Sequence, residues 1–186
     1  MPPEPSTPSA RVTPVPAQPG DVDAIHALRR SLEDWMADRG VVQWPRGSLP
    51  RERVATQVAA GEWWVVPDGA DDGRPGGSTR ALAATVRLLR ADPDFWGDDT
   101  TPAVYVHGLM VDRRRSGDGL GAALLDWAAA QGRDAGVGLI RLDCRTSNPA
   151  LRRYYEGRGF RAVGERDFGT HVNVLLEQPL GGDAGS

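Results

Sequence analysis

The sequence predicts one mixed α/β domain built around a single sheet. Helix-like and strand-like patterns are mixed along the chain without an internal repeat, and a strand, a glycine-rich loop and a helix follow one another in the C-terminal half. The length of 186 residues suits one domain. Residues 11–180 are therefore expected to form the domain, between a disordered proline-rich tail at 1–10 and a flexible tail at 181–186.

The N-terminal half carries two helix signals before its main strands. Asp21 is the expected cap of a first helix that ends at Gly40, because apolar residues follow at helical spacing. A second helix is expected over 50–60. The remaining elements are an edge strand at 11–15, strands at 62–66 and 80–90, and loops at 67–79 and 92–102.

The C-terminal half alternates strands and helices more clearly. Ala103 to Val111 reads as a buried strand, and a basic glycine-rich loop at 113–121 leads into a helix over 120–133. The elements expected after it are a strand at 138–144, a short helix at 149–156, and a closing hairpin of strands at 161–166 and 172–176.

Composition excludes several kinds of protein. The net charge of −3 gives no sign of a nucleic-acid or membrane partner, and no apolar stretch could span a bilayer. All 22 basic residues are arginine, so the lysines of a Walker A loop and of a Schiff base are missing. The single Cys144 cannot form an internal disulfide, which favours a cytoplasmic location. No metal is expected, since His26, His107 and His171 lack ligand spacing.

The loop at 113–121 is typical of an anion site. The first backbone N–H groups of a helix lack partners within it and favour negative charge. Gly117, Gly119 and Gly121 would let a diphosphate approach the backbone, and arginines 113–115 add positive charge. A tight turn beside a solvated charge run would give the same pattern.

The same glycines allow a second interpretation. Gly117, Gly119 and Ala122 fit G-x-G-x-x-A, and Asp143 follows at a tolerable distance, so a dinucleotide-binding oxidoreductase is an alternative. Against it, the motif begins after more than half of the chain, which leaves too little sequence for a doubly wound sheet.

Residues 104–160 resemble the GCN5-related N-acetyltransferase (GNAT) family in two motifs. The first, R/Q-x-x-G-x-G/A at a strand-to-helix junction, is present from Arg114 to Gly119. The second is an Asn after the next strand, then a short helix with a Tyr, then Gly-Phe. It is present as Asn148, Tyr155 and Gly159-Phe160. The resemblance implies a central mixed, mostly antiparallel sheet that is splayed in the middle and flanked by helices.

The resemblance also implies a role for each matching residue. Leu109, Met110 and Val111 would lie along the pantetheine arm of coenzyme A. The diphosphate would be bound by the loop, that is by Arg114, Arg115, Ser116, Gly117, Gly119, Leu120 and Gly121. Asn148 would contact the cofactor arm, and Tyr155 would lie near the thioester sulfur. Ser116 and Asp118 stand where many members are basic, and we expect the Asp118 side chain to point outward.

Acyl transfer to an amine needs an acid for the leaving thiolate and a base for the amine. Tyr155 is the candidate acid, although helical spacing alone would also suit a core tyrosine. His107 is a candidate base on the strand that leads to the loop, although a hydrogen-bonded core histidine would look the same. Glu33, Asp34 and Glu62 are other candidates for the base.

The predicted activity is therefore transfer of an acetyl group from acetyl-CoA to a primary amine of a small molecule. Direct attack in a ternary complex is expected, because no residue suits a covalent intermediate. A catalytically degenerate acyl-CoA sensor is the alternative from another class, kept open by Asp118. The resemblance implies a bacterial enzyme and allows a homodimer.

Overall fold

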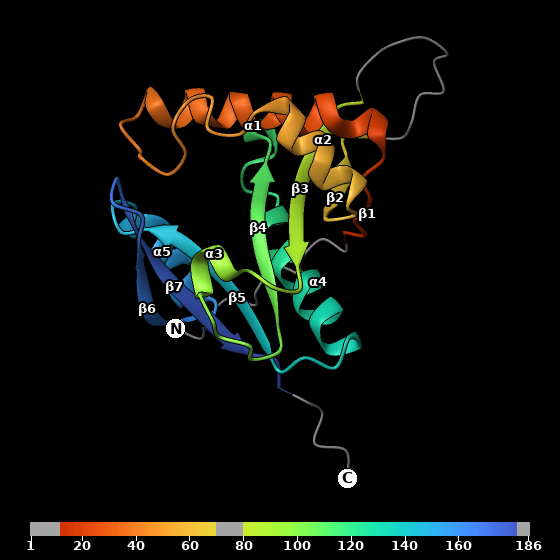
Figure 1. Ribbon diagram of the computed structural model, residues 1–186. Helices are drawn as coiled ribbons and strands as arrows, with labels where there is room; N and C mark the ends of the chain where they lie inside the picture. The colour runs from red at the N-terminus through yellow and green to blue at the C-terminus, as the bar shows by residue number, and fades with distance from the viewer. Residues whose placement is uncertain (1–11, 70–79, 182–186) are drawn as a thin grey trace, which may run out of the picture.

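The computed structural model describes residues 12–69 and 80–181, which form one open sheet with helices on both faces (Figure 1). The seven strands lie in the order β1-β2-β3-β4-β5-β7-β6. Their bounds are β1 Val15–Pro16, β2 Trp63–Pro67, β3 Leu82–Leu89, β4 Ala103–Val111, β5 Leu139–Arg145, β6 Arg161–Asp167 and β7 Val172–Pro179. The helices are α1 Val22–Ala37, α2 Arg51–Ala59, α3 Pro93–Trp96, α4 Leu120–Asp134 and α5 Pro149–Gly157.

Every neighbouring pair of strands is antiparallel except β4 and β5. This arrangement confirms the predicted mixed, mostly antiparallel sheet flanked by helices. The strand predicted at Ala103 to Val111 has the expected bounds. The segment at 92–102, expected to be a loop, contains the one-turn helix α3, which begins with Pro93 in a position where its missing N–H costs nothing.

The edge strand expected at 11–15 is shorter and later, because β1 pairs with β2 only through Val15 and Pro16. Arg11, most of the loop expected at 67–79, and the tails at 1–10 and 182–186 lie outside the described residues.

Each face of the sheet has its own hydrophobic core. Helices α4 and α5 cover one core, where Val104, Leu124 and Ile140 are fully buried. Helices α1 and α2 cover the other core over β2 to β4, with Ile25 and Trp63 at its centre. The sheet is thus fixed from both sides, and this holds its strand ends in place for a binding site.

Strands β4 and β5 diverge after a short parallel ladder. Their register covers only Ala103 to Tyr105 on β4 and Leu139 to Arg141 on β5. On its other side β4 stays paired with β3 as far as Val111. The β5-facing edge of β4 is therefore open from residue 106 onward, and the two strands form the predicted splay.

A β-bulge at the splay depends on Gly108. The ladder between β3 and β4 shifts register between Thr85 and Arg87, and Gly108 on β4 has φ +52°. The alternation of side chains between the two faces of the sheet is interrupted at Gly108. His107 therefore lies on one face, and Leu109 packs toward the α4 core on the other. A bulge of this kind redirects side chains at the end of a strand.

Gly108→Ala is expected to lower the free energy of unfolding by about 3 kcal/mol. A Cβ at this position would lie 2.8 Å from Cζ3 of the buried Trp63 ring, and the left-handed backbone adds a penalty of its own. Urea unfolding measures the change. Gly136→Ala is the matched control, since Gly136 has φ +70° and nothing within 4 Å, so it should lose only about 1 kcal/mol. Equal losses in both variants would contradict this packing argument.

Candidate active site

The open edge of β4 lies beside the N-terminus of α4. The side chains of Leu109 and Val111 approach Gly121, whose ideal Cβ would lie 3.8 and 3.9 Å from them. Met110 points the other way and is buried in the core under α1. Of the three residues expected along the pantetheine arm, two therefore present side chains toward α4, and Met110 can contribute only its backbone.

The glycine-rich loop leaves space in front of α4. Gly117 and Gly119 both have positive φ, +97° and +76°, and nothing lies within 4 Å of a Cβ built on either. Gly119 is the N-cap of α4, so the unpaired N–H groups of the first turn follow it directly. A ligand anion can therefore reach the backbone here without a side-chain clash.

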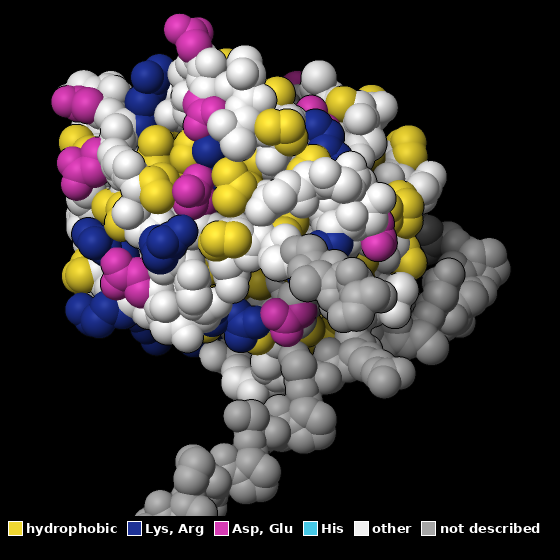
Figure 2. Space-filling view, turned by 90° about the horizontal axis from the view of Figure 1, so that it is seen from below, with side chains coloured by type: hydrophobic (Ala, Val, Ile, Leu, Met, Phe, Trp, Pro, Cys, Tyr) yellow, Lys and Arg dark blue, Asp and Glu magenta, His cyan; other side chains and the backbone are white. Residues whose placement is uncertain are grey.

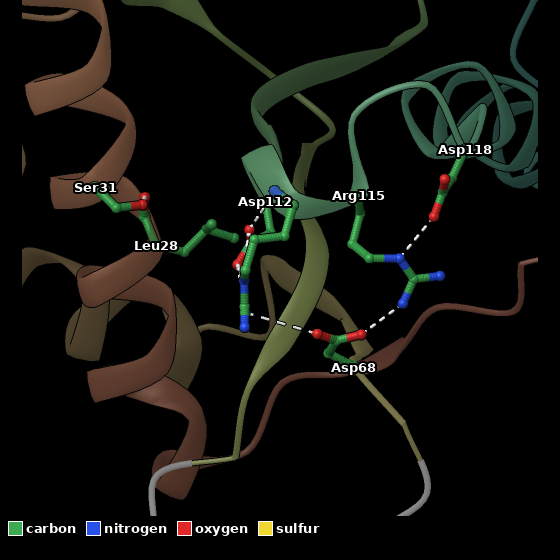
Figure 3. A network of polar contacts seen from close by, with 7 residues as sticks. Leu28, Ser31, Asp68, Asp112, Arg115 and Asp118 are labelled. Atoms are coloured by element: carbon green, nitrogen blue, oxygen red, sulfur yellow. Dashed lines mark hydrogen bonds and ion pairs between the residues drawn. The ribbon is translucent and has the colours of Figure 1, made fainter.

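The arginines of the loop are already paired with carboxylates (Figure 3). Arg115 binds Asp118 at 2.6 Å and Asp68 at 2.5 Å, while Arg114 binds Asp112 at 2.8 Å. These contacts lower the pKa of Asp112, mainly through the Arg114 side chain, and raise the pKa of both arginines. The loop is thus close to neutral, and an anion would be held mainly by backbone N–H groups.

Arg113 and Asp118, at the two ends of the arginine-rich loop, both make contacts within the protein. Arg113 stacks on the ring of Trp35 in α1, with Cζ 4.1 Å from the ring centroid. The Asp118 side chain is exposed and turns to Arg115. Because Asp118 is paired with Arg115, its carboxylate would repel a phosphate much less than an unpaired carboxylate would.

Two neighbouring tyrosines on α5 have different surroundings. Tyr155 is buried against Phe160, and burial, followed by the nearby Cys144 and Asp143, raises the pKa of its phenol far above the usual value. Tyr154 is 42% exposed, and its hydroxyl would lie 3.4 Å from a Cβ on Gly121. Burial raises the pKa of Tyr154 as well, so both phenols keep their protons at neutral pH.

Asn148 has a structural role besides the cofactor contact expected from the family motif. Its Oδ1 accepts from the backbone N–H of Leu151 and so caps α5. Its Nδ2 donates to Gln43, and the backbone N–H of Arg145 donates to the same Gln43 oxygen. Gln43 thereby ties the α1–α2 loop to the end of β5, on the far side of the splay from β4.

His107 lies between two carboxylates at the splay. Its Nε2 is 2.8 Å from Asp92 Oδ2, and its Nδ1 is 3.5 Å from Asp143 Oδ1. Burial raises the pKa of Asp143, an effect that His107 and Asn173 partly oppose. His107 thus joins β4, the start of α3 and β5 at the point where the two strands separate.

Aromatic rings lie next to this histidine. Phe95 of α3 approaches His107 with ring centroids 5.2 Å apart, and it contacts Phe168 of the β6–β7 turn at 5.0 Å. Phe168 stacks on His171. Figure 1 shows α3 in front of the sheet where β4 and β5 diverge, so these rings border the same side of the splay as His107.

The other candidate bases are held in structural contacts. Glu33 is fully buried, binds Arg29 at 2.8 Å and accepts from the backbone N–H of Gly47, which fixes the α1–α2 loop. Asp34 pairs with Arg46, and Glu62 pairs with Arg87. Of the proposed bases, His107 is the one that lies at the splay.

Several functional classes find no support in the described residues. Cys144 is fully buried, and burial raises the pKa of its thiol to about 11, so it is a poor nucleophile. No group of three or more metal-ligating side chains occurs within 12–69 and 80–181. No helix in that part of the chain is long and apolar enough to cross a membrane. On the face shown in Figure 2, acidic, arginine and hydrophobic side chains are interspersed without a continuous field of one charge.

Three polar residues at the splay are not predicted as site residues by the sequence. The sequence places Asp92 in a loop and Asp143 in a possible dinucleotide motif, and no pattern points to Asn173. One signal was available, since Arg141, Asp143 and Arg145 alternate along a strand that otherwise reads as buried. That alternation indicates a polar face on β5, although it does not reveal which residues oppose it.

Comparisons with known proteins agree with this geometry. Residues 28–160 match the family model for the Acetyltransferase (GNAT) family. The chain is 32% identical over 165 residues to the uncharacterized N-acetyltransferase YesJ of Bacillus subtilis (strain 168), covering 84% of this chain and 86% of that protein.

Solved structures show the same fold. A GNAT-family acetyltransferase from Listeria monocytogenes 4b F2365 superposes with a TM-score of 0.70 at 25% identity, over 90% of this chain and 94% of that one. The structure of yncA from Salmonella typhimurium with its cofactor acetyl-CoA superposes with a TM-score of 0.61 at 16% identity, over 95% and 98%. The sheet, its splay, the glycine loop and the matched family model agree, and the chain belongs to the GNAT acetyltransferase family.

Proposed function

We propose that this protein transfers an acetyl group from acetyl-CoA to a primary amine of a small molecule, by direct attack in a ternary complex. The observation that carries the proposal is the open β5-facing edge of β4, which leads from His107 to the glycine loop at the start of α4. The proton-bearing Tyr155 is buried on α5, the helix that follows β5.

The residues present fit a coenzyme A thioester. An extended pantetheine arm can pair with the unpartnered backbone of residues 106–111 on β4. The diphosphate fits the open space before Gly119 and the free N–H groups of α4, where the helix dipole favours negative charge. Bound in this way, acetyl-CoA supplies the activated acyl group.

The protein's own groups supply the proton transfers. His107 takes a proton from the amine nitrogen through Nδ1, while Asp92 holds its Nε2–H and stabilises the resulting imidazolium. Tyr155 gives its proton to the sulfur as the C–S bond breaks. An acceptor that starts as the ammonium loses two protons: the first goes to His107 and from there to water, and the second, lost as the amide forms, returns the tyrosine to its starting state.

Two other functions are weaker. A dinucleotide oxidoreductase would need a doubly wound parallel sheet, whereas β4–β5 is the one parallel pair among the described strands. A sensor without turnover would have no use for a histidine that is oriented by Asp92 beside the cofactor edge.

The experiment that tests the function has two steps. Calorimetric titration with acetyl-CoA, CoA, NAD and FAD comes first, and we expect binding by acetyl-CoA and CoA alone. A panel of primary amines with acetyl-CoA follows, with free thiol release as the readout. Binding without turnover of any amine would favour the sensor, and binding of a dinucleotide would favour the oxidoreductase.

His107→Gln is expected to lower kcat by about 100-fold at pH 7, because the amine loses its general base. Raising the pH should restore part of the rate, since more of the amine is then neutral in solution. A pH series of kcat for both proteins measures this. An unchanged kcat at pH 7, where chemistry limits turnover, would remove His107 from the mechanism.

A further inference from the structure

When a neutral His107 carries its proton on Nε2, its other nitrogen, Nδ1, faces the Asp143 carboxylate with no proton between them. Asp92 lies 2.8 Å from Nε2, so a neutral imidazole places its hydrogen on Nε2. Nδ1 then carries a lone pair and lies 3.5 Å from Asp143 Oδ1, which is an acceptor too. Two acceptors that face one another need a donor between them or beside them.

A third acceptor belongs to the same group of side chains. Asn173 of β7 donates from Nδ2 to Asp143 Oδ2 at 2.5 Å, which fixes the orientation of its carboxamide. The other end of that carboxamide, Oδ1, is buried and accepts no hydrogen bond from any described residue, and Asn173 as a whole is only 5% exposed. A buried carbonyl oxygen without a donor is costly, and a donor that entered next to Asp143 would satisfy it.

We infer that Asp143 and Asn173 form the binding site for the ammonium group of the acceptor amine, next to His107. A primary ammonium has three N–H donors, and Asp143 Oδ1, Asn173 Oδ1 and His107 Nδ1 are three acceptors. The inference rests on the proposed acetyltransferase function and adds the form in which the acceptor binds. The amine arrives as a cation, and His107 then removes one proton so that the nitrogen can attack.

Two of the three acceptors lie on side chains that solvent reaches, and the border of the site suits an organic cation. The side chains of His107 and Asp143 keep 17% and 10% exposure. Phe95 and the 36%-exposed Phe168 border the same side and supply apolar surface for the body of an organic amine. Burial raises the pKa of Asp143, which is the cost of holding a carboxylate where no described arginine pairs with it. The acceptor class is therefore a primary amine with an apolar or aromatic body, bound as the ammonium.

The test compares an amine with its neutral hydroxyl isostere. Phenethylamine and butylamine are screened as acceptors, and 2-phenylethanol and butanol serve as the matched competitive inhibitors. For the best amine, Asp143→Asn is expected to raise KM by about 30-fold and to change the inhibition constant of the matched alcohol less than about twofold. The loss of charge weakens only the cation, whereas a general loss of shape would weaken both ligands.

Two further variants complete the test: one removes the second acceptor, and the other is a control for the loss of charge. Asn173→Leu removes the free carbonyl oxygen at similar volume, and we expect it to raise the amine KM by about 10-fold. Asp126→Asn removes the same charge from an exposed carboxylate that pairs with Arg158 on the surface of α4, and it should leave both constants unchanged. Asp143→Asn should fold, because it replaces a buried carboxylate by a neutral group of the same shape.

The outcomes separate the two claims. An amine KM that rises selectively in Asp143→Asn supports the inference. An active wild type whose Asp143→Asn variant keeps its preference for amine over alcohol overturns the inference and leaves the acetyltransferase function standing. A wild type that binds acetyl-CoA yet acetylates no amine of the panel overturns the proposed function, and the inference with it.

Discussion

Tyr155→Phe is expected to lower kcat by about 100-fold while the dissociation constant for acetyl-CoA stays within twofold of wild type. The variant loses one hydroxyl and keeps the ring that packs on Phe160. None of the hydrogen bonds among the described residues uses that hydroxyl, so its loss should not destabilise the fold. The raised pKa of Tyr155 means that the phenol carries its proton at neutral pH. Single-turnover kinetics with a saturating amine, together with calorimetry, would measure both constants.

Tyr154 provides the matched comparison, since the neighbouring residue loses the same atom. Its hydroxyl lies beside Gly121 at the start of α4, on the side where we propose that the diphosphate binds. Tyr154→Phe is therefore expected to weaken acetyl-CoA binding by a few-fold and to retain kcat. The reverse pattern, with kcat lost in Tyr154→Phe and kept in Tyr155→Phe, would transfer the acid role to Tyr154.

Gly119→Glu is expected to weaken acetyl-CoA binding by more than about 100-fold. The new carboxylate would stand at the N-cap of α4, in the space that the diphosphate needs. Two like unit charges about 5 Å apart repel by about 3 kcal/mol at an effective dielectric constant of 20, which corresponds to this loss. Calorimetric titration of the variant measures the dissociation constant directly.

The control for this variant is Gly136→Glu in the turn between α4 and β5. Gly136 has φ +70° and free space around it, so the backbone penalty and the added charge match those at Gly119. Gly136→Glu should bind acetyl-CoA normally. Normal binding by folded Gly119→Glu would show that the loop is not the phosphate site, and equal loss in both variants would indicate a general effect of charge or folding.

The bounds of β4, α4 and α5 were predictable from sequence because local patterns determine them. Apolar periodicity marks the buried faces of α4, and Asn148 and Pro149 mark the start of α5. The two family motifs also predict the glycine loop and the splay, because the motifs lie within one continuous stretch of the chain. The exposed side chain of Asp118 was also expected correctly.

The polar group around His107 was not predictable in this way. Asp92 directly precedes α3, while Asp143 and Asn173 lie on β5 and β7, and no local pattern in the sequence shows that the three meet. They meet because the order β4-β5-β7 puts β7 next to β5, and because the splay leaves room between β4 and β5. The pairing of Arg115 with the distant Asp68 has the same origin.

The sequence by itself determined the family, the strand–loop–helix that suits a diphosphate, and Tyr155 and His107 as candidate proton carriers. Only the tertiary structure decided which of the candidate bases lies at the splay, and which acids surround it. The physical reason is that hydrophobic periodicity and turn chemistry act within a few residues. The electrostatic surroundings of a side chain depend on strand order and register, which bring together residues as far apart as Asp92 and Asn173.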